Sequence, residues 1–209
     1  MKIRAKALFS KEQKEKIRQA VLAAEGSTRA DIAIMLVDES DRYREAELTG
    51  ALSFSALVAL VLSMALHHLT IWFYIPLTAV LLFPFVRLFR VFPHMKLAFL
   101  HRKRVEEAVR ERAIYAFFQK GVHKTDEETG ILIFISLLER KVWILADKGI
   151  HGKIASGLLR TLAGEVAIGI KEDRALEALC GVIEKCGAEL ARYFPGSHGK
   201  GQPGDEIIR

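Results

Sequence analysis

The sequence has 209 residues, of which 51% are apolar and 27% charged, and its 31 Lys and Arg against 25 Asp and Glu give a net charge of +6. This length allows one soluble domain with its own core beside a membrane segment, and it excludes two such domains. The basic residues gather beside one long apolar stretch and form no runs interleaved with aromatic residues, which favours anionic lipid over nucleic acid as the partner.

The chain is predicted to begin with an amphipathic helix. Ser10 and Gln13 have the spacing of a capping box, apolar residues then recur on one helical face, and Gly26 ends the helix. Residues 31–37, DIAIMLV, are short and almost wholly apolar, as expected of a strand that is covered on both faces. Acidic residues close this strand, and a helix is expected over 42–50.

Residues 48–86 contain no Asp, Glu, Lys or Arg. The first part, 48–66, would be roughly 28 Å long as a helix, close to the ~30 Å hydrocarbon core of a bilayer. Residues 67–70 break the apolar run, and 71–86 supply a second, shorter segment. We therefore predict a two-helix transmembrane hairpin. The alternative, a buried helical pair in a soluble core, fits poorly because the uncharged stretch is far longer than a buried helix.

Basic residues flank the hairpin on both sides, and the loop between its two spans has none. Arg42 and Arg44 precede the first span, and residues 87–101 are predicted to form a basic amphipathic segment at the membrane surface. The cations expected to reach lipid phosphate are Arg87, Arg90, Lys96, Arg102, Lys103 and Arg104. This pattern predicts a protein of the cell (inner) membrane with two spans and both termini in the cytoplasm. No removable signal peptide is visible in the first 20 residues.

The second half of the chain carries the clearest strand pattern. Residues 102–120 keep helical periodicity, and Gly121 ends that helix. The runs 130–136 and 141–147 are strand-like and only four residues apart, so they should pair antiparallel. The strand 31–37 reaches them through a helical crossover, which makes that pairing parallel if the strands are adjacent. We expect an α/β fold, a mixed sheet sandwiched by helices.

Two further helices are expected over 151–169 and 171–193. Cys180 and Cys186 are about 9 Å apart along the second of these helices, too far for a disulfide, so both should be free thiols. The predicted organisation is a soluble domain that the membrane hairpin interrupts. Its parts are 1–47, the first part of the soluble domain; 48–86, the hairpin; 87–101, the surface segment; 102–194, the rest of the domain; and 195–209, a flexible glycine-rich tail.

Six short motifs are spread over nearly the whole chain. They are Phe9-Ser10, the strand 31–37 with its acidic end, Gly121-Val122-His123, 129–136, 140–147 and 149–152. In this order they resemble the TPM domain family, and more narrowly its bacterial branch of membrane proteins in which a transmembrane hairpin follows the first strand. The resemblance implies an α/β/α sandwich. It implies no single activity, because members are described as acid phosphatases, photosystem-repair factors and receptor accessory subunits.

Five carboxylates lie at predicted strand ends or in the adjacent turn, where the loops of an α/β sheet can gather them around a hard cation such as Ca²⁺ or Mg²⁺. They are Asp38, Asp126, Glu127, Glu128 and Asp147. We take Asp38, Asp126 and Glu127 as the candidate metal ligands. The family resemblance implies metal or phosphatase chemistry for an acidic cluster that aligns with residues 126–128, although the family pattern alternates Asp with Lys or Asn. A solvated acidic turn is the alternative.

No complete catalytic motif is present, since the sequence lacks a glycine-rich phosphate loop, HExxH, CxxC and GxSxG. Two functions stay open. The first is a membrane-anchored interaction or accessory module for another membrane or stress-response protein, without nucleic acid. The second is a weak metal-dependent acid phosphatase acting on phosphomonoesters.

Overall fold

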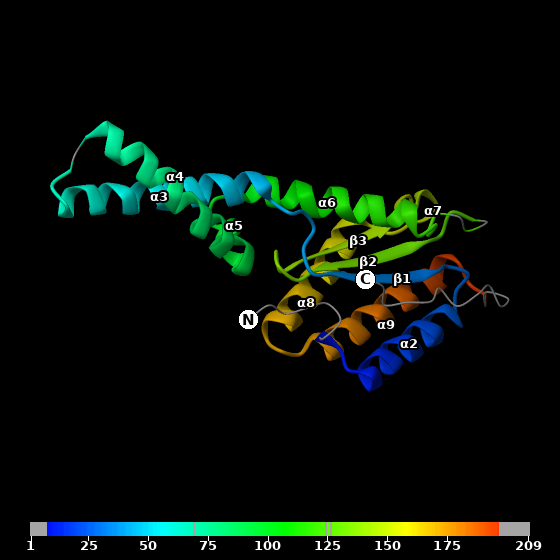
Figure 1. Ribbon diagram of the computed structural model, residues 1–209. Coiled ribbons are helices and arrows are strands. Elements are labelled where there is room, and N and C mark those ends of the chain that lie inside the picture. The colour runs from blue at the N-terminus through cyan, green and yellow to red at the C-terminus, as the bar shows by residue number, and fades with distance from the viewer. Residues whose placement is uncertain (1–7, 69, 124, 126, 197–209) are drawn as a thin grey trace. The chain divides into compact units, whose positions relative to one another are not determined.

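The structure is a computed structural model that describes residues 8–68, 70–123, 125 and 127–196 (Figure 1). The chain divides into two compact units. We call residues 8–40 together with 107–196 the α/β unit, and residues 41–106 the hairpin unit.

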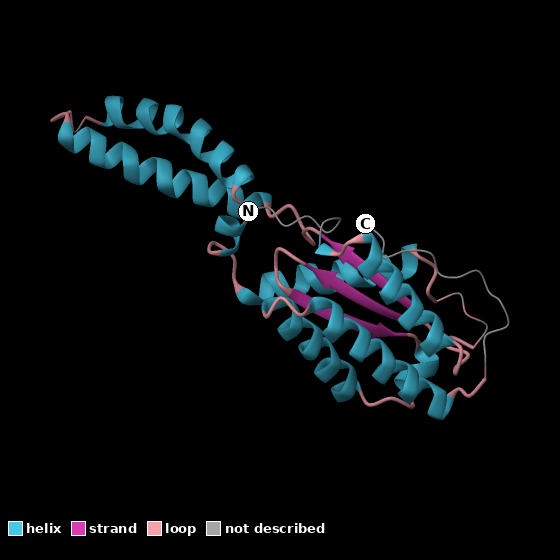
Figure 2. Cartoon of the chain, turned by 90° about the horizontal axis from the view of Figure 1, so that it is seen from below, coloured by secondary structure: helices cyan, strands magenta, loops and turns pink. Residues whose placement is uncertain are grey.

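The α/β unit contains a three-stranded sheet of order β1-β2-β3, drawn in magenta in Figure 2. Strand β1 is Ile32–Val37, β2 is Ile131–Ser136 and β3 is Lys141–Ala146. The first two pair in parallel and the last two pair antiparallel. The predicted antiparallel pairing of β2 with β3 and the predicted mixed sheet are therefore confirmed. The central strand is buried along its whole length, which explains why its sequence is a continuous apolar run.

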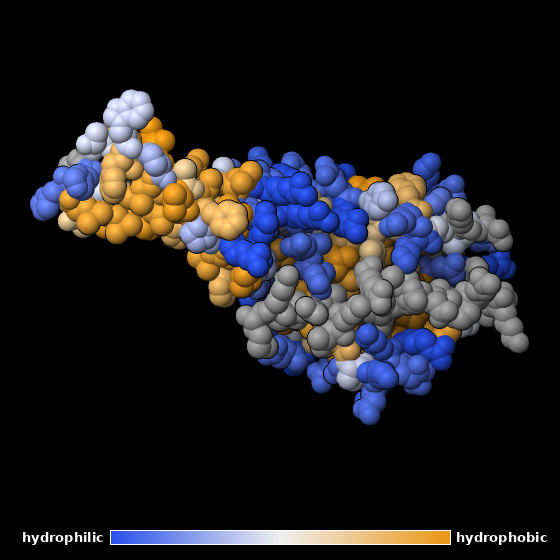
Figure 3. Space-filling model, in the orientation of Figure 1, coloured by the Kyte–Doolittle hydropathy of each residue, from blue (hydrophilic) through white to orange (hydrophobic). Residues whose placement is uncertain are grey.

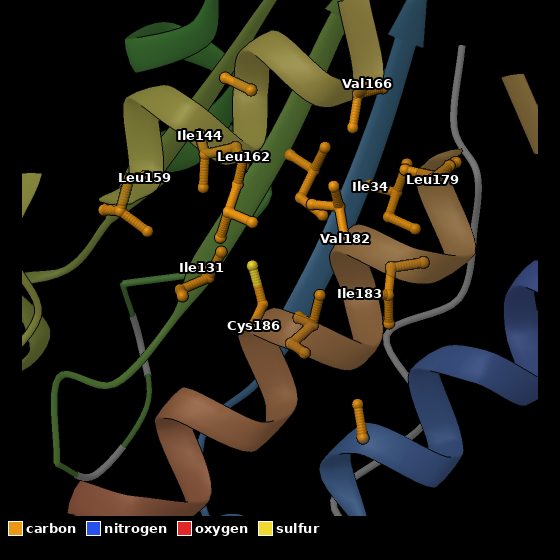
Figure 4. Close-up of a cluster of buried hydrophobic side chains, with 14 of the residues drawn as sticks. Ile34, Ile131, Ile144, Leu159, Leu162, Val166, Leu179, Val182, Ile183 and Cys186 are labelled. Carbon is orange, nitrogen blue, oxygen red and sulfur yellow. The ribbon is translucent and has the colours of Figure 1, made fainter. Parts of the chain in front are cut away.

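Three helices cover one face of this sheet: α2 (Lys11–Glu25), α8 (Ser156–Lys171) and α9 (Ala175–Tyr193). The capping box expected at the start of α2 is present, with Ser10 and Gln13 bonded to each other's backbone N–H. Figure 4 shows the shared core, in which side chains from the strands and from α8 and α9 meet; its labelled members include Ile34, Ile131, Ile144, Leu162, Val182 and Ile183.

Helix α6 (Arg102–Gln119) covers the other face of the sheet with its residues from 107 onward. Its apolar side chains meet those of β1 and β2 in a second core, whose buried members are Met35, Val37, Leu132, Phe134, Val109, Ala113, Ala116, Phe117 and, after the helix, Val122. Helices on both faces of a mixed sheet confirm the predicted sandwich. The helix expected over 151–169 is α8, which begins later, at Ser156, because His151 ends the short α7 (Lys148–His151) and residues 152–155 connect the two helices.

The hairpin unit consists of α3 (Arg44–Ala65), α4 (Ile71–Val91) and the short α5 (His94–Leu97). The helix expected over 42–50 and the first span are one continuous helix, and the second helix runs five residues beyond the expected end at 86. Small residues on α3 face α4 at intervals of four and are buried: Ala51, Ser55, Ala59 and Ser63. Small side chains at this spacing let two helix backbones approach closely.

Most of the large apolar side chains of the two helices are exposed, and Phe89 near the end of α4 is the fully buried exception among the described residues. Trp72 is 85% exposed and Phe83 is 81% exposed, and the other exposed apolar residues include Leu52, Leu57, Val61, Met64, Ile75 and Val80. Figure 3 shows the resulting apolar surface in orange over α3 and α4. Both helices are long and apolar enough to cross a membrane, and none of the most apolar window of α4 is buried.

Candidate functional site

The parallel pairing of β1 and β2 decides where the predicted metal ligands lie. Asp38 follows the carboxyl end of β1, whereas Glu127 precedes the amino end of β2. In parallel strands these ends are opposite, and a six-residue strand is about 20 Å long. The structure therefore does not bring Asp38 and Glu127 together. Asp126, the third candidate, lies outside the described residues.

Neither of the two described candidates is enclosed. Asp38 is exposed, and Glu127 accepts a hydrogen bond from Arg29 with an Nη1 to Oε1 distance of 2.9 Å. Both side chains of that pair are about half exposed, and such surface ion pairs contribute little to stability. Within the described part of the chain, no group of three His, Cys, Asp or Glu side chains is placed to hold a metal ion.

Asp147 is the most enclosed carboxylate at the Glu127 end of the sheet, with 8% of its surface exposed. Its Oδ1 accepts the backbone N–H of Lys148 at 2.8 Å, which caps α7. Its Oδ2 is buried and has no hydrogen-bond partner among the described residues. A buried carboxylate oxygen without a partner is unfavourable, so this atom is a candidate for contact with a water molecule or a cation.

Two glycines hold the backbone closely around Asp147. The Asp147 N–H donates to the Gly130 carbonyl at 2.9 Å, and the Gly149 N–H donates to the Glu128 carbonyl at 3.1 Å. A Cβ at Gly149 would lie 2.6 Å from the Glu127 carbonyl oxygen, and one at Gly130 would lie 2.0 Å from that of Val122. Neither position has room for a side chain, which gives a physical reason for two of the glycines in the family-like motifs.

A polar network that sequence reasoning missed lies at the opposite end of the sheet. The carboxylate of Glu139 accepts the Ser40 N–H at 2.9 Å and also the hydroxyl of Ser136, and the Ser40 hydroxyl donates to Ser136 Oγ at 2.9 Å. Ser136 and Glu139 are buried. The network fastens the β2–β3 turn to the residues that follow β1. Its members are satisfied within the network, so it serves packing and offers no free group for chemistry.

A second charged cluster lies in the hairpin unit where α3 begins and α4 ends. Glu47 accepts from Arg90 Nε at 2.6 Å and pairs with Lys96 Nζ at 3.2 Å. The side chains of Glu47 and Lys96 are only 9% and 7% exposed, whereas that of Arg90 is 64% exposed. Lys96 also donates to the Arg42 carbonyl. Arg90 and Lys96 thus neutralise the buried carboxylate of Glu47. Without these partners, a charge buried between apolar helices would destabilise the fold.

Arg104 holds the start of the hairpin unit through two carboxylates. Its Nη2 lies 2.6 Å from Asp41 and 3.2 Å from Glu45, and the guanidinium carbon lies 5.9 Å from the centre of the Tyr43 ring. Partial burial raises the pKa of Asp41, but the hydrogen bonds and charge of Arg104 outweigh it and lower that pKa overall.

The six predicted membrane-surface cations thus divide into two groups. Arg87, Arg102 and Lys103 are exposed, and Arg90 is exposed at its outer end. Lys96 differs from the expectation that it reaches lipid phosphate, because it is buried against Glu47; Arg104 is paired with Asp41. The available signal was the position of Glu47, the last acidic residue directly before the uncharged stretch, since a carboxylate at such a place needs a cation beside it.

A solved structure with a similar fold is the NMR structure of the BA42 protein from the psychrophilic bacterium Bizionia argentinensis. The two share 18% sequence identity with a TM-score of 0.53, over 90% of this chain and 84% of the other. At this identity the likeness concerns the fold alone. No protein-family model and no curated protein matches the sequence. The comparisons therefore support the mixed α/β architecture.

Proposed function

We propose that α3 and α4 anchor this chain in a membrane as a transmembrane hairpin. The observation that carries the proposal is the distribution of side chains: small residues line the helix interface, and most of the large apolar residues point outward. A helix pair in the core of a soluble protein would bury its large apolar residues. In lipid the arrangement is favourable, because hydrocarbon solvates the outer face and close packing holds the helices.

The basic residues support one orientation. Positive charges on both flanks of a hairpin favour the cytoplasmic side, and the described loop between α3 and α4 has none. Both flanks must lie on the same side in any case, because β1 precedes the hairpin while β2 and β3 follow it in one sheet. We therefore propose the cell (inner) membrane as the location, anionic headgroups as the lipid partner, and a cytoplasmic α/β unit.

We further propose that the α/β unit is a TPM-like interaction or accessory module for another protein. The outer face of α6 supports this proposal, since it exposes Tyr115 and Phe118 one turn apart, with the Arg112 guanidinium carbon 5.6 Å from the Tyr115 ring centre. Exposed aromatic residues beside arginine are typical of protein interfaces. The separation of Asp38 from Glu127 also favours a binding role, because two carboxylates at opposite ends of the sheet cannot act together in one catalytic site.

The interaction proposal is tested by photo-crosslinking in intact cells. A photoreactive amino acid at Tyr115 should give one adduct of defined mass, whereas the same probe at the exposed Gln19 on α2 should give none. Because the two positions cover opposite faces of the α/β unit, non-specific crowding would label both. Equal labelling at both positions, or none at Tyr115, would contradict the proposal.

The weak metal-dependent acid phosphatase is kept as a second candidate on account of Asp147. Its buried Oδ2 and the nearby Glu127 are the described carboxylates at this end that would hold Ca²⁺ or Mg²⁺. If so, either cation should raise the melting temperature of the detergent-solubilised chain, and Asp147→Asn should abolish both that rise and phosphomonoester turnover. Asp38→Asn, at the opposite end of the sheet, is the matched control. A cation effect that survives Asp147→Asn would eliminate this candidate.

A further inference from the structure

We propose that Arg87 and Arg90 together bind the phosphate of one anionic phospholipid, and that Glu47 positions Arg90 for this contact. The inference rests on the proposed membrane anchoring and gives the lipid partner a defined site. It assigns different roles to the six basic residues next to the apolar stretch: Arg87 and Arg90 contact the lipid, Lys96 neutralises Glu47, and Arg104 pairs with Asp41 and Glu45. The exposed Arg102 and Lys103 contribute only diffuse charge.

The geometry of Arg90 is the first step of the argument. A guanidinium has five N–H donors in a rigid, planar fork. Arg90 uses its Nε for the 2.6 Å hydrogen bond to Glu47, and its terminal nitrogens bond no residue that the structure describes. The side chain is largely exposed. Glu47 therefore holds the guanidinium from behind and leaves its two terminal nitrogens facing outward, as bidentate binding of a phosphate requires.

Arg87 supplies the second cation. It lies one turn before Arg90 on α4, is exposed, and forms no ion pair with any described residue. Residues three apart on a helix are neighbours, with about 5–6 Å between their Cβ atoms. The cluster therefore holds three cations, Arg87, Arg90 and Lys96, against the single carboxylate of Glu47. An anion between the two arginines relieves the excess charge.

The surface below these arginines favours a lipid over a free phosphate ion. Val80 and Phe83 are exposed on α4 and precede Arg87 by seven and four residues, which places all three on one stripe of the helix. A phospholipid whose phosphate meets Arg87 and Arg90 can lay an acyl chain along this stripe. Val91 and Phe92, exposed beside Arg90, continue the apolar surface at the headgroup level.

The test is native mass spectrometry of the full chain in detergent, titrated with dioctanoyl phosphatidylglycerol or dioctanoyl phosphatidylcholine. We expect the original chain to prefer the anionic lipid. Arg87→Gln and Arg90→Gln should each reduce this preference about fivefold, the effect of one phosphate contact at a membrane surface. Lys103→Gln removes an exposed cation outside the site and should change the preference less than twofold. Equal losses for all three variants would show diffuse attraction and overturn the proposal.

Variants at Glu47 best discriminate diffuse electrostatic attraction from positioning of Arg90, because the two predict opposite changes in the affinity for the anionic lipid. Glu47→Leu makes the protein more basic, so diffuse electrostatics would strengthen binding of the anionic lipid. If Glu47 positions Arg90, Glu47→Leu should bind the anionic lipid more weakly than the original chain. Glu47→Gln keeps an acceptor oxygen and should bind with an affinity between those two. Tighter binding by Glu47→Leu would overturn the proposal, and the intermediate Gln variant guards against a folding defect.

Two further arms separate the possible sources of failure. Inorganic phosphate at the concentration of the lipid should not displace it; equal displacement would assign the site to a free anion. Carbonate extraction of membranes that contain each variant reports anchoring separately. Arg90→Gln should stay in the membrane fraction while losing lipid preference, so loss of the lipid site is distinguishable from loss of the anchor.

Discussion

Exchanging one methyl group between two helices tests the packing of the α/β unit. Gly187 on α9 is buried against Ala24 on α2, and a Cβ at Gly187 would lie only 2.6 Å from the Cβ of Ala24 and 3.1 Å from its Cα. Carbon atoms in contact are about 3.5–4.0 Å apart. Gly187→Ala must therefore push the two helices apart by about 1 Å, whereas Ala24→Gly would create the room that the new methyl group needs.

The sizes of the competing effects decide whether each substitution raises or lowers the free energy of unfolding. Gly187→Ala gains up to about 1 kcal/mol in helix propensity but costs about 1–3 kcal/mol through overpacking, so we expect a net loss near 1 kcal/mol. Ala24→Gly costs about 1 kcal/mol in propensity and about 0.8 kcal/mol for the buried methyl group. In the double variant the 2.6 Å clash between the two Cβ atoms is absent, the 3.1 Å approach to the Cα of residue 24 remains, and the propensity changes cancel. Its stability should return to within about 1 kcal/mol of the original, a coupling of about 2 kcal/mol.

The measurement is equilibrium urea unfolding of the full chain in detergent, followed by tryptophan fluorescence. The chain has two tryptophans, and Trp143 lies on β3 within the α/β unit. A Trp72→Phe background therefore reports this unit alone. Additive losses, with the double variant less stable than either single variant, would refute the close approach of α2 and α9.

Three further predictions concern buried groups of the α/β unit. Burial raises the pKa of Cys186 to about 12 and also raises that of Cys180, which is less buried, so maleimide at pH 8 should modify Cys180 slowly and Cys186 only after unfolding. Because the folded-state pKa of Cys186 exceeds its unfolded value, its contribution to stability should be full below pH 9 and decline between pH 9 and 12; Cys186→Val should lack this decline. Glu139→Ala leaves the Ser40 N–H and the Ser136 hydroxyl without their acceptor, and urea unfolding should show a loss of about 2–4 kcal/mol; a loss below 0.5 kcal/mol would contradict the network.

The sheet and its covering helices were predictable because their signals are local. Two β-rich runs four residues apart leave an antiparallel hairpin as the simplest pairing, and a strand that returns through a crossover must run parallel. The capping residues Ser10 and Gln13 identified the start of α2 for the same reason, since their hydrogen bonds span three residues. The small residues on α3 that face α4 carry a comparable local pattern, although only the structure shows which face they line.

The charged residues were less predictable because their partners are distant in sequence. Asp38 and Glu127 both adjoin strands, but one follows its strand and the other precedes it, and parallel pairing places them at opposite ends. Lys96 was expected at lipid phosphate among other basic residues, whereas it pairs with Glu47, which lies 49 positions earlier on α3. Helix continuity was also missed where polarity changes, since α3 runs from charged Arg44 into the apolar span without a break.

Topology labelling tests the central claim, that α3 and α4 span a membrane with the α/β unit in the cytoplasm. Single cysteines at His68, between the two helices, and at Gln19, on α2, are placed in a chain that lacks Cys180 and Cys186. An impermeant maleimide applied to intact spheroplasts should label the His68→Cys chain and should label the Gln19→Cys chain only after lysis. Labelling at Gln19→Cys but not at His68→Cys would reverse the orientation, and labelling at neither would contradict a hairpin that crosses the membrane.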